Sequence, residues 1–465
     1  MTGTPSPKDI STKLQRIAEL ASWTPKLAIT SLSQHIDIDW LKEAYRRTRK
    51  DGAVGVDGQT ATAYAANLES NLQMLLDRAK SGRYFAPPVR RVHIPKDDGK
   101  TRPLGIPTFG DKVLQRAVVM ALEPIYEQDF LDCSYGFRPG RSAHQALESF
   151  WQQAMRMGGG WVLEVDIRSF FDTLDHGHLR AILQRRVRDG VVLRLIGKWL
   201  NAGVMEGGAI ERVEQGTPQG GVISPLLANI YLHHVLDEWF ATEVKARLAG
   251  RAFLVRYADD FVIGFSEEAD AVQVQQWLAE RFATHGLQLH PEKTRLVRFE
   301  APKDDGPAPG SFDLLGFTHY WGRTRAGGWA IKRKTSSKRL RRAFQRIADW
   351  CRKHRHDPIP QQHAMLTKKL RGHYAYYGIT GNARALGLVW RAAEDLWQKW
   401  LSRRSQRARI PWDRFRRLLA VFKLPRPGVV HSVYRAANPA PAANQQRFAP
   451  PAAAKPRPAP PAKKK

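Results

Sequence analysis

The sequence has little cysteine, no long apolar run and no excess of acidic residues. Only Cys133 and Cys351 occur among its 465 residues, which excludes a disulfide framework and a four-cysteine zinc site. One Cys–Cys pair is formally possible, but a reducing, cytoplasmic location is the simpler expectation. A run of about 18 apolar residues never occurs, and residues 1–13 lack the apolar centre of a secretory signal. We therefore expect no membrane span.

Positive charge is abundant and unevenly distributed. The chain carries 74 Lys and Arg against 44 Asp and Glu, a formal charge of +30, which makes nucleic acid the leading class of partner. Residues 1–331 hold 41 basic and 39 acidic side chains, whereas residues 332–435 hold 27 and 5. Residues 436–465 add six basic side chains and no acidic ones. The excess charge therefore belongs to a C-terminal module and its tail.

Composition divides the chain into four segments. We expect an N-terminal lead segment over residues 1–34 and an α+β domain over residues 35–330, where short apolar runs alternate with helix-like segments. Residues 331–435 form a basic helical module. The Ala- and Pro-rich residues 436–465 lack the apolar content to fold alone, so we expect a disordered tail. Three helices are predicted in the basic module, over residues 338–353, 363–377 and 386–404.

Two apolar segments far apart in the sequence end at carboxylates. Residues 161–166 have the pattern of a strand whose last residue is an aspartate. Residues 252–257 and 261–265 have the pattern of two strands separated by only three residues. We therefore predict a β-hairpin with Asp259 and Asp260 in its tight turn.

A glycine-rich loop lies between these segments, at residues 216–225. Ser224 is a typical N-cap and Pro225 a typical first helical residue. Apolar residues then recur roughly at helical spacing towards Trp239, so we predict that a helix begins directly after the loop.

Carboxylates that converge from a strand end and a hairpin suit nucleotidyl transfer. This reaction needs two divalent ions about 4 Å apart, and magnesium prefers hard oxygen ligands such as carboxylates and phosphates. Asp166, Asp259 and Asp260 provide such ligands. A lone Asp-Asp pair is a weak signal, because most such pairs are solvated turn residues. The interpretation therefore depends on the motifs that accompany the pair.

Those motifs occur in order along the chain. They are the segments at residues 52–58, 135–142, 165–172, 216–229, 257–260, 287–294 and 312–317. The segment Tyr-Ala-Asp-Asp at 257–260 and the segment Val-Asp-Ile-Arg-Ser-Phe-Phe-Asp at 165–172 resemble the catalytic motifs of the reverse transcriptases encoded by group II introns. The other segments resemble further motifs of the same family, and the resemblance covers roughly residues 35–435.

The resemblance implies a fold, an activity and partners. Residues 35–330 would form the fingers and palm of a right-hand polymerase, with an antiparallel sheet, and residues 331–435 a helical thumb and maturase domain. Such a protein is an RNA-directed DNA polymerase that extends a DNA primer or target with dNTPs, copies group II intron RNA, and assists splicing and mobility of the intron. Many relatives also carry an H-N-H endonuclease domain with cysteine pairs. Since no cysteine follows Arg435, we expect that domain to be absent.

By position, the resemblance assigns the catalytic residues. Asp166, Asp259 and Asp260 would bind two Mg²⁺ ions, assisted by the backbone carbonyl of Ile167. Lys293 is a candidate general acid for the leaving group, with a surface salt bridge as the alternative.

The resemblance also assigns contacts to the incoming nucleotide. Lys96 and Arg102 would clamp the triphosphate, because two cations offset the charge that develops on the pyrophosphate; solvated charges are the alternative. Phe171 would lie beneath the sugar and exclude a 2′-hydroxyl, with a plain core residue as the alternative. Gln219 would contact the nucleotide, and Gly220 would let the backbone approach closely.

Candidate RNA contacts gather in the basic helices. They are Arg339, Arg342, Arg346, Arg371, Tyr374 and Tyr377. Phosphate contacts of this kind are independent of sequence and sensitive to salt, and aromatic rings suit stacking on RNA bases. For each aromatic side chain, packing between helices is the alternative.

Three functions fit these observations. The first is an active intron-encoded polymerase with maturase function. The second is a non-catalytic RNA-folding protein, against which the intact acids Asp166, Asp259 and Asp260 argue. The third is a reverse transcriptase that serves DNA repair or phage defence without an intron, and the maturase-like segment favours the first function over this one.

Overall fold

The computed structural model describes residues 7–25, 27–95, 101–206, 209–211, 216, 220–302, 309–324, 326–405 and 409–432. The chain divides into two compact units, Met1–Ser337 and Lys338–Lys465. Lys96, Gln219 and the predicted tail at 436–465 lie outside the described residues.

A long helix forms the centre of the first unit. α5 (Phe109–Asp129) is buried along most of its length, and α1 (Pro7–Trp23) and α2 (Ile38–Arg47) pack against it. The indole of Trp40 donates a hydrogen bond of 2.9 Å to the carbonyl of Ala117. Because the apolar face of α1 joins the same core, this helix is part of the first unit.

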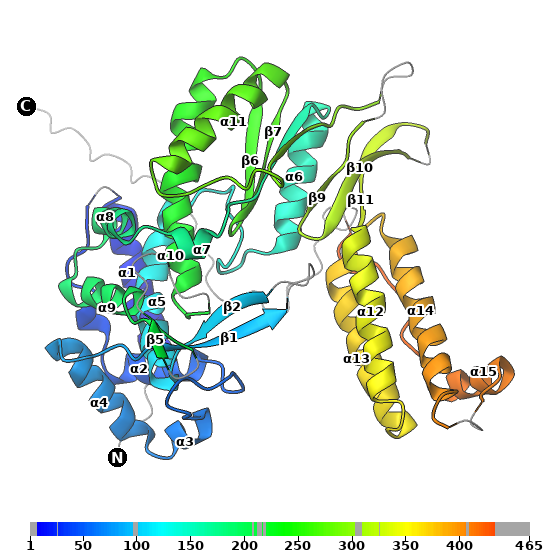
Figure 1. Ribbon diagram of the computed structural model, residues 1–465. Coiled ribbons are helices and arrows are strands. Elements are labelled where there is room, and N and C mark those ends of the chain that lie inside the picture. The colour runs from blue at the N-terminus through cyan, green and yellow to red at the C-terminus, as the bar shows by residue number, and fades with distance from the viewer. Residues whose placement is uncertain are drawn as a thin grey trace, which may run out of the picture. The chain divides into compact units, whose positions relative to one another are not determined.

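The other helices of this unit surround α5 and a central sheet (Figure 1). They are α3 (Ala61–Ala65), α4 (Leu68–Ser81), α6 (Ala143–Met157), α7 (Phe170–Thr173), α8 (His176–Arg186), α9 (Gly190–Leu200), α10 (Ser224–Leu232) and α11 (Glu268–Ala283). Short 3₁₀ turns occur at Ser33–His35 and Lys245–Arg247, and α10 continues into two π-helical segments, His233–Glu238 and Phe240–Val244.

The central sheet has the order β6–β7–β3–β8, and every neighbouring pair is antiparallel. Its strands are β3 (Trp161–Val165), β6 (Ala252–Tyr257), β7 (Asp260–Phe265) and β8 (Arg295–Arg298). The prediction of a strand followed far along the chain by a hairpin is therefore confirmed. The hairpin packs on two helices. The ring of Phe253 on β6 contacts Phe150 of α6, and the ring of Phe261 on β7 contacts Phe282 of α11.

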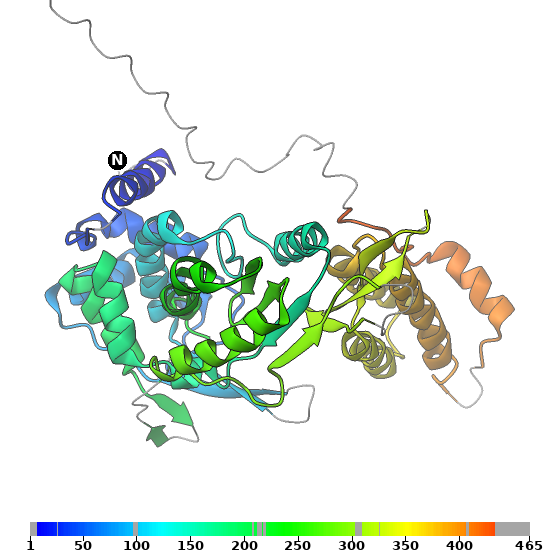
Figure 2. The same ribbon diagram turned by 90° about the horizontal axis from the view of Figure 1, so that it is seen from above.

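Two smaller sheets complete the unit. The first has the order β2–β1–β4–β5, with strands β1 (Val89–Pro95), β2 (Thr101–Ile106), β4 (Val204–Glu206) and β5 (Ala209–Glu211), and the pair β4–β5 projects from the rest of the unit (Figure 2). The second contains β9 (Phe312–Leu314), β10 (Phe317–Arg323) and β11 (Trp329–Thr335). Since β11 pairs with β10 along its whole length, the first unit extends to Ser337, beyond the predicted boundary at 330.

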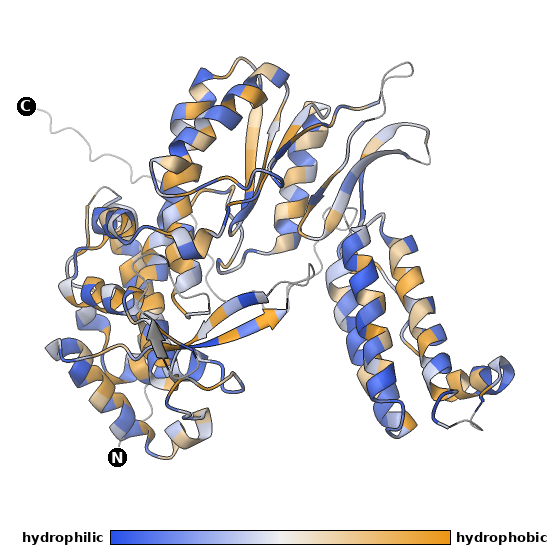
Figure 3. Cartoon of the chain, in the orientation of Figure 1, coloured by the Kyte–Doolittle hydropathy of each residue, from blue (hydrophilic) through white to orange (hydrophobic). Residues whose placement is uncertain are grey.

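The second unit is helical. It contains α12 (Ser337–Lys353), α13 (Ile359–Tyr377), α14 (Ala383–Leu401) and α15 (Trp412–Val421). The first three confirm the predicted basic helices. Figure 3 shows that hydrophilic residues dominate α12, whereas β6 and β7 of the first unit are mainly hydrophobic. No helix in the described ranges is both long enough and apolar enough to cross a membrane.

Candidate active site

The register of the central sheet brings the three candidate acids to one edge. In the antiparallel pair of β3 and β7, Val165 lies opposite Phe261, and in the hairpin Tyr257 lies opposite Asp260. Asp166 directly follows Val165, and Asp260 directly precedes Phe261. The continuation of the pairing therefore sets Asp166 beside the start of β7. Asp259 lies in the adjoining turn, so a strand end and a distant hairpin supply carboxylates to the same place.

The electrostatics of Asp259 reflect this crowding. Burial raises the pKa of the Asp259 carboxyl, and the nearby charge of Asp166 raises it further. Arg102 and Arg256 act in the opposite direction. Arg102, the predicted triphosphate contact on β2, therefore lies close enough for its charge to act on this carboxylate.

Lys293 is already paired at the site. Its Nζ donates to Oδ2 of Asp166 at 2.5 Å, and its side chain is 61% exposed. The segment that carries Lys293 is tied to the same strand end, because the amide of His290 donates to the carbonyl of Asp166 at 2.8 Å and Ile167 bridges to Leu289. The salt bridge that the sequence left as an alternative is thus present, and its partner is a candidate metal ligand.

The backbone of the motif at residues 135–142 supports the acidic turn. Ala258 has a φ of +58°, a left-handed conformation that the turn imposes on a non-glycine residue. A Cβ atom on Gly136 would lie 2.3 Å from the amide nitrogen of Ala258, so only glycine permits this contact. Asn229 of α10 donates to the carbonyl of Gly136 at 2.7 Å. Two segments distant in sequence therefore hold the turn in place.

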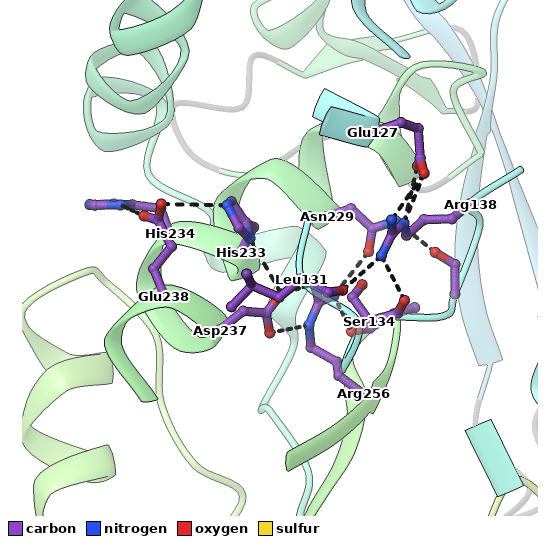
Figure 4. Close-up of polar contacts among 12 residues, drawn as sticks. Glu127, Leu131, Ser134, Arg138, Asn229, His233, His234, Asp237, Glu238 and Arg256 are labelled. Carbon is purple, nitrogen blue, oxygen red and sulfur yellow. Dashed lines mark hydrogen bonds and ion pairs between the residues drawn. The ribbon is translucent and has the colours of Figure 1, made fainter. Parts of the chain in front are cut away.

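A buried arginine completes this support, and sequence reasoning missed it. Arg256 is fully buried and donates to both carboxylate oxygens of Asp237, at 2.8 and 2.5 Å (Figure 4). Its Nη1 also donates to the side-chain oxygen of Asn229 at 2.9 Å and to the carbonyl of Ala258 at 3.0 Å. The available signal was a single charged residue inside the apolar strand 252–257, directly before the acidic motif.

The partner of Arg256 belongs to a wider charged cluster on the first π-helical segment. Burial opposes the ionisation of Asp237, but the Arg256 guanidinium holds the pKa of Asp237 below its usual range. His233 contacts Asp237 at 3.8 Å and Glu238 at 3.5 Å. Although burial disfavours the imidazolium, these carboxylates raise the pKa of His233 to about 9. Arg256 thus connects this charged cluster to the turn.

The loop that opens α10 is held by hydrogen bonds from α5. Oε1 of Gln115 accepts from the amides of Val222 and Ile223 at 2.8 and 3.4 Å. Ile223 is the N-cap and Ser224 the first helical residue, so the prediction of Ser224 as N-cap is wrong by one residue. The physical reason is that Ile223 already has helical backbone angles, with the amides of Val222 and Ile223 held by Gln115, a residue distant in sequence.

Two further predicted nucleotide contacts, Gly220 and Phe171, lie within the described residues. A Cβ atom on Gly220 would lie 2.7 Å from the carbonyl of Gly105 on β2, so the loop approaches the β1–β2 hairpin closely. Phe171 of α7 is partly exposed and packs against the core, and its neighbour Phe170 is 2% exposed within that core.

The oxygen donors at the edge of the sheet suit magnesium. Carboxylates and a backbone carbonyl are hard ligands, and a divalent cation would favour the ionised form of Asp259 against burial and the charge of Asp166, both of which raise its pKa. In the described part of the chain, no group of three or more His, Cys, Asp or Glu side chains stands ready to enclose a metal ion. The acids therefore do not form a closed set of ligands by themselves, and Lys293 supplies the positive charge beside Asp166.

In the second unit, the candidate RNA contacts have different surroundings. Arg339 and Arg346 are exposed on α12, and Arg371 is exposed on α13. Burial raises the pKa of Tyr377, and the charges of Arg339, Arg342 and Arg346 act in the opposite direction, so the three arginines lie near this side chain. Tyr374 is only 5% exposed and belongs to the core of the unit, which supports the alternative of helix packing for this residue.

Comparisons with known proteins give consistent results. Residues 94–319 match the family described as reverse transcriptase (RNA-dependent DNA polymerase). The chain is 38% identical to Protein YkfC of Escherichia coli (strain K12) over 324 residues, which cover 62% of this chain and 84% of that protein.

Two further relatives have names that refer to introns. The chain is 43% identical over 195 residues to Group II intron-encoded protein LtrA of Lactococcus lactis subsp. cremoris, covering 42% of this chain and 31% of that protein. It is 29% identical over 235 residues to Nuclear intron maturase 2, mitochondrial, of Arabidopsis thaliana, covering 41% of this chain and 30% of that protein. The chain thus spans most of YkfC but less than a third of these two proteins.

Proposed function

This chain belongs to the reverse transcriptases and maturases encoded by group II introns, and from that membership we propose that it copies intron RNA by metal-assisted extension of a DNA primer and assists folding, splicing and mobility of that RNA. The single observation that carries the catalytic part is the strand register that sets Asp166 beside the turn of Asp259 and Asp260. Convergent carboxylates on a rigid sheet are the arrangement that nucleotidyl transfer requires.

The acids would hold the catalytic ions. Asp166, Asp259 and Asp260, with the carbonyl of Ile167, would hold two Mg²⁺ ions. When bound, such ions would favour ionisation of the attacking primer hydroxyl and neutralise charge on the pyrophosphate. Asp259 must be ionised to take part, and Arg102 favours its ionised form.

The remaining residues would orient the nucleotide and handle one proton. Arg102, together with Lys96, would hold the triphosphate, and Gln219 with the close-packed Gly220 would align the base and template. Phe171 would exclude a 2′-hydroxyl beneath the sugar. Lys293 would keep Asp166 oriented before substrate arrives and then donate a proton to the leaving pyrophosphate.

The helical unit would bind RNA through its cations. Three of these cations lie on α12, near Tyr377: Arg339, Arg342 and Arg346. The fourth, Arg371, lies on α13. Contacts of this kind would stabilise the folded intron by preferential binding, so that the splicing chemistry remains with the RNA.

Extension of a 5′-labelled DNA primer on an RNA template, with purified protein, dNTPs and magnesium, tests this function. We expect full-length cDNA from the wild type and none from Asp166→Asn, because an amide cannot replace the carboxylate as a charged ligand. Asp413→Asn, at an exposed acid on α15, is the matched control and should extend normally. Failure of the wild type to extend any primer, while it still promotes splicing of the flanking RNA, would favour a non-catalytic RNA-folding protein instead.

A further inference from the structure

A pocket opens on the helical unit between α12 and α13. Its volume is about 280 Å³, and Val389 of α14 contributes to its lining. Pockets that hold small ligands start at about 300 Å³, so this one matches a single small group and is too narrow for a duplex. It lies wholly within the second unit. We call it the α12–α13 pocket.

Cations surround this pocket. Arg339, Arg342 and Arg346 recur every three or four residues and so share one face of α12, and Lys369 faces them from α13. No acidic residue is among the described residues that line it. Such an arrangement attracts an anion, and Arg side chains suit the oxygens of a phosphate.

The other side of the pocket is apolar. Ile347, Leu370 and Val389 line it, and each is at most 6% exposed. The ring of Tyr377 lies at the same site, half-buried, and its centroid is 4.6 Å from that of His373. A free phosphate gains nothing from an apolar wall or from a ring face. These features therefore indicate a ligand with a flat apolar part as well as an anionic one.

His373 supplies a hydrogen-bonding group without a protein partner. Its Nε2 is buried and has no partner among the described residues. Burial lowers the pKa of His373 to about 4, so the ring is neutral near pH 7 and offers one donor and one acceptor. A buried polar atom of this kind is normally satisfied, and a base edge can satisfy it.

We propose that the α12–α13 pocket holds one unpaired RNA nucleotide, with its base against Ile347 and Leu370, a hydrogen bond from the base edge to His373, and its phosphates on the arginines of α12. The proposal rests on the proposed RNA-binding function and adds the kind of RNA feature that is recognised. Only a base splayed out of a helix can enter such a pocket, and unpaired bases are the parts of RNA that proteins read most readily.

Three RNA hairpins of equal length test this proposal with the full chain. One carries a single-nucleotide bulge, the second an abasic site at the bulge, and the third is fully paired. In fluorescence anisotropy at fixed salt, we expect the bulged hairpin to bind about tenfold tighter than the abasic one, since stacking and hydrogen bonding of one base have roughly that effect. The paired hairpin should bind like the abasic one.

Two variants locate the effect. Ala343→Leu narrows the pocket from α12 while leaving every cation in place, so it should bring the ratio between bulged and abasic affinities close to one. Ala348→Leu, on the same helix but outside the pocket, is the matched control and should keep the wild-type ratio. His373→Ala should reduce the ratio severalfold without blocking entry, and it gives a second measurement if Ala343→Leu fails to fold.

Equal affinities of the wild type for the bulged and abasic hairpins would overturn the proposal, because only phosphate attraction would remain. A wild-type ratio retained in both Ala343→Leu and His373→Ala would overturn it as well, since the base would then bind elsewhere. Primer extension by the wild type on a template without bulges reports on the proposed polymerase function separately. Its failure would leave the hairpin comparison unaffected.

Discussion

Arg256 forms a fully buried ion pair with Asp237, and the same guanidinium donates a hydrogen bond to the carbonyl of Ala258 inside the acidic turn. One side chain therefore joins the π-helical segment after α10 to the turn that carries Asp259 and Asp260. A buried ion pair of this kind is weak evidence for stability by itself. Its bonds to Asp237, Asn229 and the Ala258 carbonyl connect the π-helical segment and α10 with the turn, which indicates a positioning role.

Replacement of the planar guanidinium of Arg256 should impair catalysis more than the binding of dNTP. Arg256→Lys keeps the charge but cannot contact Asp237, Asn229 and Ala258 together. We expect kcat for primer extension to fall by roughly 10- to 100-fold, the scale of a misplacement of about 1 Å, while KM for dNTP changes little. Steady-state kinetics below the unfolding temperature of the variant provide the measurement.

Removal of the partner should instead destabilise the fold. Asp237→Ala leaves Arg256 as an uncompensated buried charge, and the free energy of unfolding should fall by about 3–5 kcal/mol. Urea denaturation measures this change. Asp413→Ala removes an acid from an exposed pair and should cost at most about 1 kcal/mol. Equal losses in the two variants would contradict the assignment of a special role to the buried pair.

His233 should make stability depend on pH. Contacts with Asp237 and Glu238 raise the pKa of His233 from 6.5 to about 9 despite burial. Because the folded pKa is the higher one, the stabilising contribution is complete below pH 6.5 and is lost as pH rises through about 9. The loss should be on the order of a few kcal/mol at most.

Urea denaturation of the wild type and of His233→Gln between pH 6 and pH 10 tests this expectation. The difference in unfolding free energy between the two proteins should shrink steadily as pH increases over that range. A difference that stays constant would contradict the expectation, because it would show that the pKa of His233 is the same in the folded and unfolded protein.

Much of the candidate site could be predicted from sequence, because it is encoded in short contiguous patterns. The strand before Asp166 and the hairpin of Asp259 and Asp260 follow from apolar runs and a short turn, and both are present. The pairing of β3 with β7 is what joins them. Periodicity reports which residues form a strand but not which strand lies beside it, so this convergence came from the family resemblance alone.

The rest depends on contacts between distant residues. Arg256 pairs with Asp237 on a π-helical segment, and Gln115 of α5 accepts from the amides of the two residues before Ser224. No local pattern encodes either contact. Burial of Tyr374 follows from the packing of α13 in its own unit, which an aromatic within a basic segment does not disclose.

Catalysis and RNA binding should be separable at Asp259. Asp259→Ala removes a proposed metal ligand from the first unit, whereas the proposed RNA contacts lie on α12 and α13 of the second. We expect cDNA synthesis to be abolished, while RNA affinity in a filter-binding assay and assisted splicing remain largely intact. Loss of all three activities together would contradict separate functions, provided that circular dichroism shows the variant to be folded.

The cations of α12 should set the salt dependence of RNA binding. Each phosphate contact contributes about 0.7–0.9 to the slope of log affinity against log salt, so Arg339→Gln combined with Arg346→Gln should reduce that slope by about 1.5. Arg49→Gln, at an exposed arginine paired with Asp51 in the first unit, is a control of the same chemistry and should leave the slope unchanged. The double variant could instead show a weaker affinity with an unchanged slope. Only a lost phosphate contact changes the number of counterions released. That outcome would therefore mean that these arginines act through the fold of the helical unit and do not contact phosphates.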